Sequence, residues 1–336
     1  LAEEIIREYF YSHIVPTFLK NATVTTGGLN PEQQRQAQAK RAIGAQGFYE
    51  AITLGFYSEA ELDALHIAPD AKERNVVRIL NPISSNLTIM RPLLAPSLLG
   101  AVVENLKNGN AAGRLFELAN VYIPKQQPVT ERPEERMHLG LAAFGETEDF
   151  FALKGAIEAL GESFGIEFGF TRAADVPWLH PGIAAYLTCE GETVGVFGKL
   201  AHDVTAELKL PKGSRDTQKI FLAEIDWPAL MAHRRAALRY TPLPAYPAVA
   251  GDLALVADEA TPCGDIVAEM RRACKQLADV QLFDIYRSEA IGAGKKSMAF
   301  TLHFAAQDAP LAPDEVDRFV KKILGNLKYR MGIEMR

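Results

Sequence analysis

The sequence contains little cysteine. It has three, Cys189, Cys263 and Cys274, among 336 residues, and they form no Cys-x-x-Cys pair. An odd number leaves one thiol unpaired in any disulfide scheme, which is typical of proteins from a reducing compartment. The sequence therefore argues against a secreted disulfide scaffold and predicts a cytoplasmic protein.

Long hydrophobic runs are missing too. No apolar stretch approaches the ~20 residues that a helix needs to span a bilayer, and the N-terminus lacks the charged-then-apolar pattern of a signal peptide. We therefore expect no membrane partner. The first residue is Leu1 rather than methionine, and it lies in a helix-like stretch, LAEEIIREYF. We expect the sequence to be a piece of a longer chain.

The sequence has no excess of positive charge. Its formal net charge is −6, with 48% hydrophobic and 23% charged residues, as in ordinary globular proteins. This balance argues against a broadly basic nucleic-acid-binding protein but permits a local basic stripe. At roughly 100 to 200 residues per domain, the length of 336 residues predicts two domains and the remnant of a third.

A phosphate-binding P-loop is also absent. The stretch IGAGKKSMAF, residues 291–300, resembles one, but Glu289 occupies the first glycine position and Lys296 follows Lys295 where a hydroxyl residue is needed. Apolar residues then alternate as in a strand with one buried face, namely Met298, Phe300, Leu302 and Phe304. The stretch is better described as a glycine-rich connection between two strands, with Lys295 and Lys296 at its tip.

Turn-forming residues divide the chain into three parts. A helix begins at Pro31, is capped by Asn30 and Gln33, and ends near Gly47. Further along, the patterns predict a strand at 76–82, an amphipathic helix at 93–109 and a largely buried strand at 114–124. The proline-dense segment 240–247 predicts an extended linker. We expect three parts, residues 1–26, 27–239 and 240–336.

The part after the linker has the pattern of a small α+β domain. A strand at 252–257 precedes a helix in which Thr261 is the cap and Pro262 the first residue. Strands at 280–286 and 297–304 follow, then a helix from Pro313 and a short strand within GIEMR. This βαββαβ order predicts a ferredoxin-like domain, with two helices on one face of a four-stranded antiparallel sheet.

Several long motifs in this domain resemble a known family. AYPAVAGDLAL, LFDIYRSEAIGAGKKSMAFTLHF and the final GIEMR are similar to the ferredoxin-fold anticodon-binding domain of bacterial phenylalanyl-tRNA synthetase beta subunits. The family usually has two arginines before the aspartate, where this chain has Ala250 and Gly251. Any RNA contact of those arginines is therefore absent here.

The resemblance extends upstream over nearly the whole sequence. NPISSNLTIMRPLLAPSLLGAVVENL, RLFELANVY and WLHPGIAAYLTCEGETVGVFGKLAHDV are similar to the family's class II synthetase-like module. LAEEIIREYFYSHIVP resembles the end of the helical, metal-associated domain that precedes it. The resemblance implies an α+β fold: a class II synthetase-like antiparallel sheet with flanking helices, followed by the ferredoxin-like βαββαβ domain.

The class II-like module lacks the pattern needed for catalysis. Class II synthetases hold ATP with arginines, and Met90-Arg91-Pro92 with the strand 115–122 has their layout. Ile123-Pro124 follow, however, where an arginine is expected, and we find no glycine-rich strand ending in arginine downstream. We therefore expect no catalytic residue. Arg91 and Arg114 are better explained as fold or interface residues, and His180-Pro181-Gly182 as a structural turn.

Two glutamates near the N-terminus are the candidate metal ligands. Glu3 and Glu4 are adjacent, so on a helix their side chains diverge by about 100°, as expected of two solvated carboxylates. The resemblance implies a magnesium site here, which is shared with the alpha subunit. Two further aspartates of the beta chain would complete this site, and they would precede Leu1. Mg²⁺ suits such oxygen ligands, but we expect weak or no Mg²⁺ binding by this chain.

A local basic surface is the candidate RNA contact. Residues 242–336 hold 12 lysines and arginines against 13 aspartates and glutamates, so this domain is not basic as a whole. We predict that its clustered cations bind tRNA phosphates: Arg271, Arg272, Arg287, Lys295, Lys296, Arg318, Lys321, Lys322 and Lys328. A solvated helix face explains part of this cluster equally well. Tyr286 is either a base-stacking residue or a core tyrosine.

The resemblance implies a role without chemistry of its own. The chain would scaffold the catalytic alpha subunit and position tRNA(Phe), and the whole phenylalanine-tRNA ligase, an (αβ)2 heterotetramer, would use ATP and Mg²⁺. We expect this chain alone to be inactive. Two alternatives stay open, a self-contained ATP-dependent ligase and a small-molecule regulatory module, because ferredoxin-like sheets serve many functions.

Overall fold

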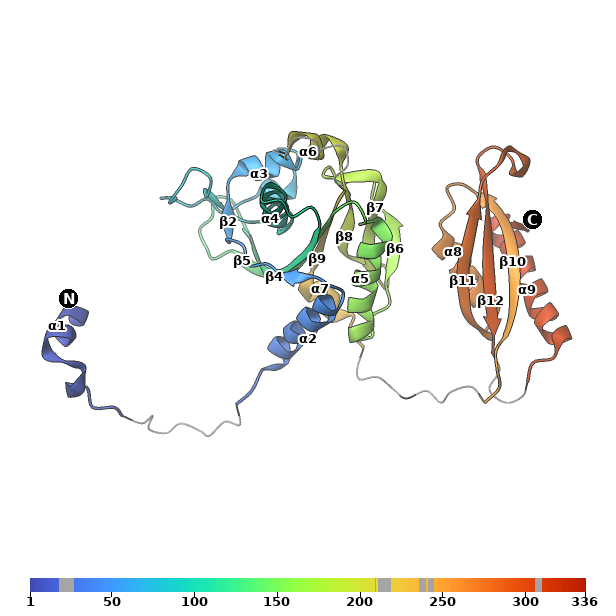
Figure 1. Cartoon of the computed structure of the whole chain (residues 1–336), viewed down its shortest axis with the longest axis horizontal. Helices are drawn as coiled ribbons and strands as arrows, with labels where there is room; N and C mark the ends of the chain where they lie inside the picture. The colour runs from blue at the N-terminus through green and yellow to red at the C-terminus, as the bar shows by residue number, and fades with distance from the viewer. Residues whose placement is uncertain (18–26, 209, 211–218, 236–239, 241–244, 306–309) are drawn as a thin grey trace. The chain divides into compact units, whose positions relative to one another are not determined.

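The fold was determined as a computed structural model. It describes residues 1–17, 27–208, 210, 219–235, 240, 245–305 and 310–336. The chain forms two compact units, Leu1–Arg234 and Arg235–Arg336, each of which is described by itself (Figure 1). The break lies close to the expected proline-dense linker, of which residues 241–244 fall outside the described part.

The first unit is built on a seven-stranded, mostly antiparallel sheet. Its strand order is β1-β4-β5-β9-β8-β7-β6, with bounds β1 Tyr49–Glu50, β4 Gly113–Ile123, β5 Glu134–Phe144, β6 Gly169–Arg172, β7 Leu179–Cys189, β8 Glu192–Leu200 and β9 Ile220–Asp226. β1 pairs parallel to β4, and the other pairs are antiparallel. The expected strand at 114–124 is confirmed as β4.

Helices cover both faces of this sheet, as Figure 1 shows for the first unit. Helices α2 (Pro31–Ala45), α5 (Phe150–Phe164) and α7 (Trp227–Ala232) supply one apolar cluster. Helices α3 (Glu59–Ala64), α4 (Ala95–Lys107) and α6 (His202–Glu207) supply the other. The capping box of α2 forms as predicted, with Asn30 accepting from the Gln33 amide at 2.9 Å.

One strand prediction in this unit is wrong. Residues 76–82 contribute a single bridge, between Arg78 and Ile89, and no regular strand. The segment instead lies beside a two-stranded ribbon of β2 (Phe56–Tyr57) and β3 (Ile89–Met90), with the 3₁₀ turn η2 (Lys72–Arg74) before it. Its apolar residues read as a strand locally, but no long neighbouring strand is available to pair with them.

The N-terminal segment has no core of its own. It consists of α1 (Ala2–Tyr9) and the 3₁₀ turn η1 (Tyr11–His13), and neither element contains a buried residue. Tyr9, Phe10 and Ile14 are exposed there.

The second unit is the predicted ferredoxin-like domain. Its sheet order is β11-β12-β10-β13, with β10 Val249–Asp258, α8 Cys263–Ala273, β11 Leu277–Tyr286, η3 Glu289–Ile291, β12 Lys295–Phe304, α9 Pro313–Met331 and β13 Glu334–Met335. The predicted alternation of β12 is confirmed, since Met298, Phe300, Leu302 and Phe304 are buried in one cluster with both helices. A small correction concerns α8, which begins at Cys263 with Pro262 as its N-cap and no cap from Thr261.

Close approach of α4 to the sheet depends on a glycine. A methyl group on Gly140 of β5 would lie 2.6 Å from Cδ1 of Leu98 and 3.1 Å from Cβ of Leu94. Gly140→Ala should therefore push α4 off the sheet and lower the free energy of unfolding by about 1–3 kcal/mol, measured by urea denaturation. The control is Gly100→Ala on the exposed side of α4, where nothing lies within 4 Å and a stability gain is expected. Equal stability of the two variants would contradict this account.

Candidate functional site

Carboxylates gather on the sheet face that α4 covers in the first unit. The strand register aligns Glu117 of β4, Gly140 of β5 and Glu224 of β9 in one row across the sheet. His138 and Asp226 form the adjacent row, two residues along each strand and therefore on the same face. Glu117, Glu224 and His138 are all buried. This face therefore carries negative charge close to its centre.

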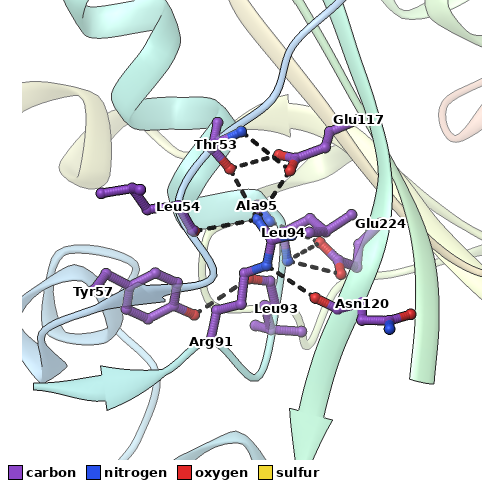
Figure 2. A network of polar contacts seen from close by, with 10 residues as sticks. All are labelled: Thr53, Leu54, Tyr57, Arg91, Leu93, Leu94, Ala95, Glu117, Asn120 and Glu224. Atoms are coloured by element: carbon purple, nitrogen blue, oxygen red, sulfur yellow. Dashed lines mark hydrogen bonds and ion pairs between the residues drawn. The ribbon is translucent and has the colours of Figure 1, made fainter. Parts of the chain in front are cut away.

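Arg91 neutralises the first of these carboxylates. Its side chain is 5% exposed, and Nη1 lies 3.1 Å from Oε1 of Glu117. Nη1 also donates to Oγ1 of Thr53 at 2.8 Å, and Nε donates to the Asn120 carbonyl at 3.0 Å (Figure 2). Together, these contacts hold the segment before α4 against β4, through Glu117 and Asn120, and against Thr53. Arg91 is therefore a fold residue, as predicted, and is not free to hold a phosphate.

Glu224 caps helix α4 from a distant strand. Both its oxygens accept from the Leu94 amide, at 3.0 and 3.1 Å, and Oε2 accepts from the Ala95 amide at 2.8 Å (Figure 2). Oε1 also lies 2.6 Å from Nδ1 of His138. Leu94, the N-cap residue, has no side-chain acceptor, so Glu224 satisfies amides that would otherwise be unpaired. Burial, and then the charge of Glu224, raise the pKa of nearby Tyr57.

A cavity of about 610 Å³ opens beside this cluster. Its charged lining consists of Glu73, Asp175, Glu224, Asp226, Lys72, His66 and His138. The carboxylates have local partners: Asp226 accepts from Nε of Arg136 at 2.6 Å, and Asp175 accepts from the Tyr186 hydroxyl at 2.8 Å. Burial, together with that hydrogen bond, raises the pKa of Tyr186 to about 12. Such a lining repels polyphosphates.

Arg114 and the His180-Pro181-Gly182 segment have structural roles. Nε of Arg114 lies 2.9 Å from Oε1 of Glu148, and Nη1 donates to the Gln46 carbonyl at 3.0 Å. Nδ1 of His180 accepts from the Gly182 amide at 3.1 Å. The pairing of β7 with β8 shifts between Leu179 and Ala184, so the segment predicted as a turn is an irregularity within β7.

The two candidate metal ligands do not fit a magnesium site by themselves. Glu3 and Glu4 lie in the first turn of α1, and Glu4 forms an ion pair with Arg7. Within the described ranges, no group of three or more His, Cys, Asp or Glu side chains could hold a metal ion. One free carboxylate and one already paired with arginine are too few ligands for Mg²⁺. Their role in metal binding stays a prediction.

In the second unit, most of the candidate tRNA-binding cations are paired with acids. Five of them form ion pairs: Arg271 with Asp279 at 3.7 Å, Arg272 with Glu269 at 2.6 Å, Arg287 with Glu259 at 2.7 Å, Arg318 with Glu315 at 3.5 Å and Lys328 with Glu334 at 2.9 Å. The hydrogen bond and charge of Arg287 lower the pKa of Glu259. Likewise, Lys328 lowers the pKa of Glu334. Lys295, Lys321 and Lys322 are exposed and have no ion pair with any described residue.

Lys296 needs a correction. It is only 9% exposed, and its Nζ donates to the Glu259 carbonyl at 2.9 Å. Its ammonium therefore supports the turn after β10 and is not presented to RNA, unlike that of its neighbour Lys295. The alternating pattern alone did not show this, because a long aliphatic stem can occupy a buried position at a strand end.

The basic surface does not lie on the open face of the ferredoxin-like sheet. The register puts Asp252, Asp279 and Asp284 on the face of the sheet away from the helices. The basic residues instead come mainly from α8 and α9. Tyr286 is 45% exposed, so the core alternative is wrong, and the Arg336 guanidinium lies 5.2 Å from its ring centre.

Sequence reasoning missed the residue that organises these cations. Glu269 of α8 is 6% exposed and accepts from Arg272 at 2.6 Å and from Asn326 at 2.8 Å. Nε of Arg330 lies 3.3 Å from Oε1 of Glu269. A buried carboxylate thus joins α8 to α9 and holds two arginines at their seam. The Glu269–Arg272 spacing of three residues was the available local signal.

The fold and the site together define the class of protein: an α+β module in which the described residues form no cationic phosphate site, joined to a ferredoxin-fold unit. Family models match both units, the phenylalanyl tRNA synthetase beta chain CLM domain over residues 15–227 and the ferredoxin-fold anticodon binding domain over 244–336. The chain belongs to the phenylalanyl-tRNA synthetase beta chain family.

Curated relatives agree with this assignment. The phenylalanine–tRNA ligase beta subunits of Clostridium tetani and Halalkalibacterium halodurans are 32% and 30% identical over 338 and 349 residues. Each alignment covers all of this chain and 42% of the relative, so the chain spans less than half the length of these relatives. The pyrrolysyl-tRNA synthetase of Desulfitobacterium hafniense superposes over 59% of this chain and 67% of its own, with a TM-score of 0.47 and 18% identity. That likeness is too low to carry an argument. Among the described helices, none is long and apolar enough to cross a membrane.

The Arg91–Glu117 pair offers a direct test of the site's architecture. Arg91→Met leaves Glu117 buried without its charge partner and should lower the free energy of unfolding by about 3–5 kcal/mol. The double variant Arg91→Met/Glu117→Met should recover much of that loss, because no lone charge remains. Urea unfolding of both measures the difference.

The exposed pair of Arg78 with Glu59 is the matched control, and Arg78→Met should cost no more than about 1 kcal/mol. A double variant as unstable as Arg91→Met alone would contradict the role of Arg91 as a neutralising fold residue.

Proposed function

We propose that this chain is the non-catalytic part of a phenylalanine–tRNA ligase beta subunit. It scaffolds the catalytic alpha subunit and positions tRNA(Phe) through its C-terminal unit. The assembled cytoplasmic enzyme, an (αβ)2 heterotetramer, uses ATP and Mg²⁺ on the alpha subunit to form phenylalanyl-tRNA. The chain alone has no ligase activity, and Glu3 and Glu4 alone bind Mg²⁺ weakly at most.

The acidic sheet face is the observation that carries the non-catalytic role. Transfer from ATP requires cationic groups aimed at the phosphates. Here Glu117 and Glu224 lie in one row across the sheet, and Asp226 lies in the adjacent row. The guanidinium of Arg91 already forms an ion pair with Glu117. The arginine of this face is thus unavailable to a triphosphate, and the acidic side chains beside it offer a phosphate no favourable contact. Binding of ATP by the chain alone, with its phosphates held at this face, would refute the proposal.

Exposed apolar side chains support contact with a protein partner. Ile52, Leu80 and Ile83 are 91%, 99% and 93% exposed, and Tyr49 and Leu54 are exposed beside them in sequence. The segment 49–57 and the arm 78–90 are joined through the β2–β3 ribbon and the Arg78–Ile89 bridge. Exposed apolar residues on two adjoining segments are typical of a protein interface. We call this surface the apolar edge and assign it to the alpha subunit.

Basic side chains on α8 and α9 support contact with tRNA. Lys321 and Lys322 are exposed on α9 and have no ion pair with any described residue. Glu269 holds Arg272 of α8 and Arg330 of α9 in place. Contacts to phosphate groups require exposed cations but do not depend on the base sequence of the RNA. A few lysines on an otherwise neutral unit can therefore position that unit on the tRNA. Remote binding of this kind contributes to catalysis by holding the acceptor end of tRNA in place for the alpha subunit.

Charge removal on this surface should weaken tRNA binding. The triple variant Lys295→Ala/Lys321→Ala/Lys322→Ala should lower the affinity for tRNA(Phe) and reduce the slope of log K against log salt by about two to three. Filter binding over a range of salt concentrations measures both quantities.

Lys107→Ala/Lys125→Ala, which removes exposed lysines of the first unit, is the control and should leave the slope unchanged. Lys296→Ala should act through stability, because its ammonium is buried. An unchanged salt slope in the triple variant would reject the proposed surface.

Charge introduction at the apolar edge should block assembly. Ile52→Asp/Ile83→Asp should abolish co-purification with the alpha subunit and leave the melting temperature unchanged, since both side chains are exposed. Phe151→Asp, at an exposed apolar residue on α5, is the matched control and should still co-purify. ATP–pyrophosphate exchange should require the alpha subunit. Exchange by this chain alone would show a self-contained ligase instead.

A further inference from the structure

The cavity of the first unit is not used by the proposed subunit or tRNA contacts. It lies between the sheet, the segment His66–Glu73 and the segment Asp175–Trp178, and its volume is about 610 Å³. Cavities of roughly 300 to 1,000 Å³ accommodate small organic ligands. Its location beside the His138–Glu224 pair places buried polar groups against this space.

The wall of the cavity is largely apolar. It is formed by aliphatic and aromatic side chains, chiefly Ile67, Leu93, Val176, Trp178, Tyr186 and Val196. Trp178 is buried, and Tyr186 is oriented by its hydrogen bond to Asp175. This wall suits a ligand with a hydrocarbon or aromatic body, and the two aromatic rings also favour a nearby cation.

Charge determines which sign of ligand the cavity accepts. Four carboxylates line it, Glu73, Asp175, Glu224 and Asp226, against one lysine, Lys72. One of them, Asp226, is paired with an arginine, Arg136, at 2.6 Å. The Lys72 side chain is 91% exposed and lies 3.8 Å from Glu73, so it projects mostly into solvent. The other cationic candidate, His66, contacts Asp203 and Glu207 at 3.2 Å each. The cavity therefore disfavours anions.

His138 provides a specific acceptor. Both oxygens of Glu224 accept backbone N–H groups, so its carboxylate acts as an acceptor, and Nδ1 of His138 donates to it at 2.6 Å. The remaining ring nitrogen, Nε2, is then an acceptor in the neutral ring. His138 is 9% exposed and lines the cavity, and its Nε2 makes no hydrogen bond to any described residue. The Nε2 atom is therefore accessible from the cavity and open to a donor from a ligand.

We propose that this cavity binds a small organic amine. The protonated amine donates to Nε2 of His138 and lies near the acidic side chains of the lining, while its hydrocarbon or aromatic body packs against Trp178 and Tyr186. An ammonium group supplies donors and no acceptor, which matches a lining of acceptors. An alcohol of the same shape loses the charge interaction, and a carboxylate reverses its sign.

Calorimetric titration of the whole chain tests the proposal with three probes of equal body. Phenethylamine should bind with a stoichiometry of one, 2-phenylethanol should bind about fivefold more weakly or worse, and 3-phenylpropionate should not bind. On addition of phenethylamine, the nitrogen NMR signal of His138 Nε2 should shift in the direction of an accepted hydrogen bond, while Nδ1 stays protonated.

Two variants locate the binding. Ala71→Trp, which fills the lining at a half-exposed position, should abolish phenethylamine binding, and Glu73→Gln should weaken it about fivefold. Ala290→Trp, at an exposed alanine of the second unit, is the control and should leave it unchanged; melting curves confirm that each variant folds. The proposal is overturned if phenethylamine shows no saturable binding, if the acid binds as well as the amine, or if Ala71→Trp binds like the unaltered chain.

Discussion

The capping of α4 by Glu224 is the contact on which the first unit depends. A helix N-terminus brought against the middle of a sheet carries unpaired amides into a place where water cannot reach them. Gly140 permits this approach, because any side chain there would meet Leu94 and Leu98. The Glu224 carboxylate then accepts from Leu94 and Ala95, and His138 holds it in place. The same atoms that stabilise the helix thus fix a negative charge at the centre of the face.

Arg91 shows why a sequence motif and its chemistry can separate. The Met90-Arg91-Pro92 layout resembles that of class II synthetases, in which arginine faces phosphate. In this chain the guanidinium makes its contacts with Glu117, Thr53 and Asn120 inside the protein. A buried guanidinium with an ion pair and several hydrogen bonds cannot be withdrawn at small cost. The arginine of this motif therefore stabilises the segment before α4 and does not bind a ligand.

Local patterns predicted what local forces determine. The alternation of Met298 to Phe304 follows from the period of a strand, and the capping box at Asn30 from residues three positions apart. The ferredoxin-like order follows from the succession of such local patterns. The strand predicted at 76–82 failed because pairing requires a neighbour that no local pattern reveals. The His138–Glu224 contact joins residues 86 positions apart, and the burial of Lys296 depends on the Glu259 carbonyl in another strand's turn. Those features become visible only once the register is known.

One sheet face in each unit carries several acidic side chains. In the first unit Glu117, Glu224 and Asp226 lie on the face beneath α4. In the second, Asp252, Asp279 and Asp284 lie on the face away from the helices. Many ferredoxin-like sheets bind RNA on that face through aromatic residues, but three aspartates make it unfavourable for a polyanion here. The cations of α8 and α9 remain, and Glu269 neutralises part of their charge while fixing Arg272 and Arg330. On such a surface the fixed positions of the cations matter more for phosphate binding than a large net positive charge. This suits a unit that orients tRNA for chemistry performed elsewhere.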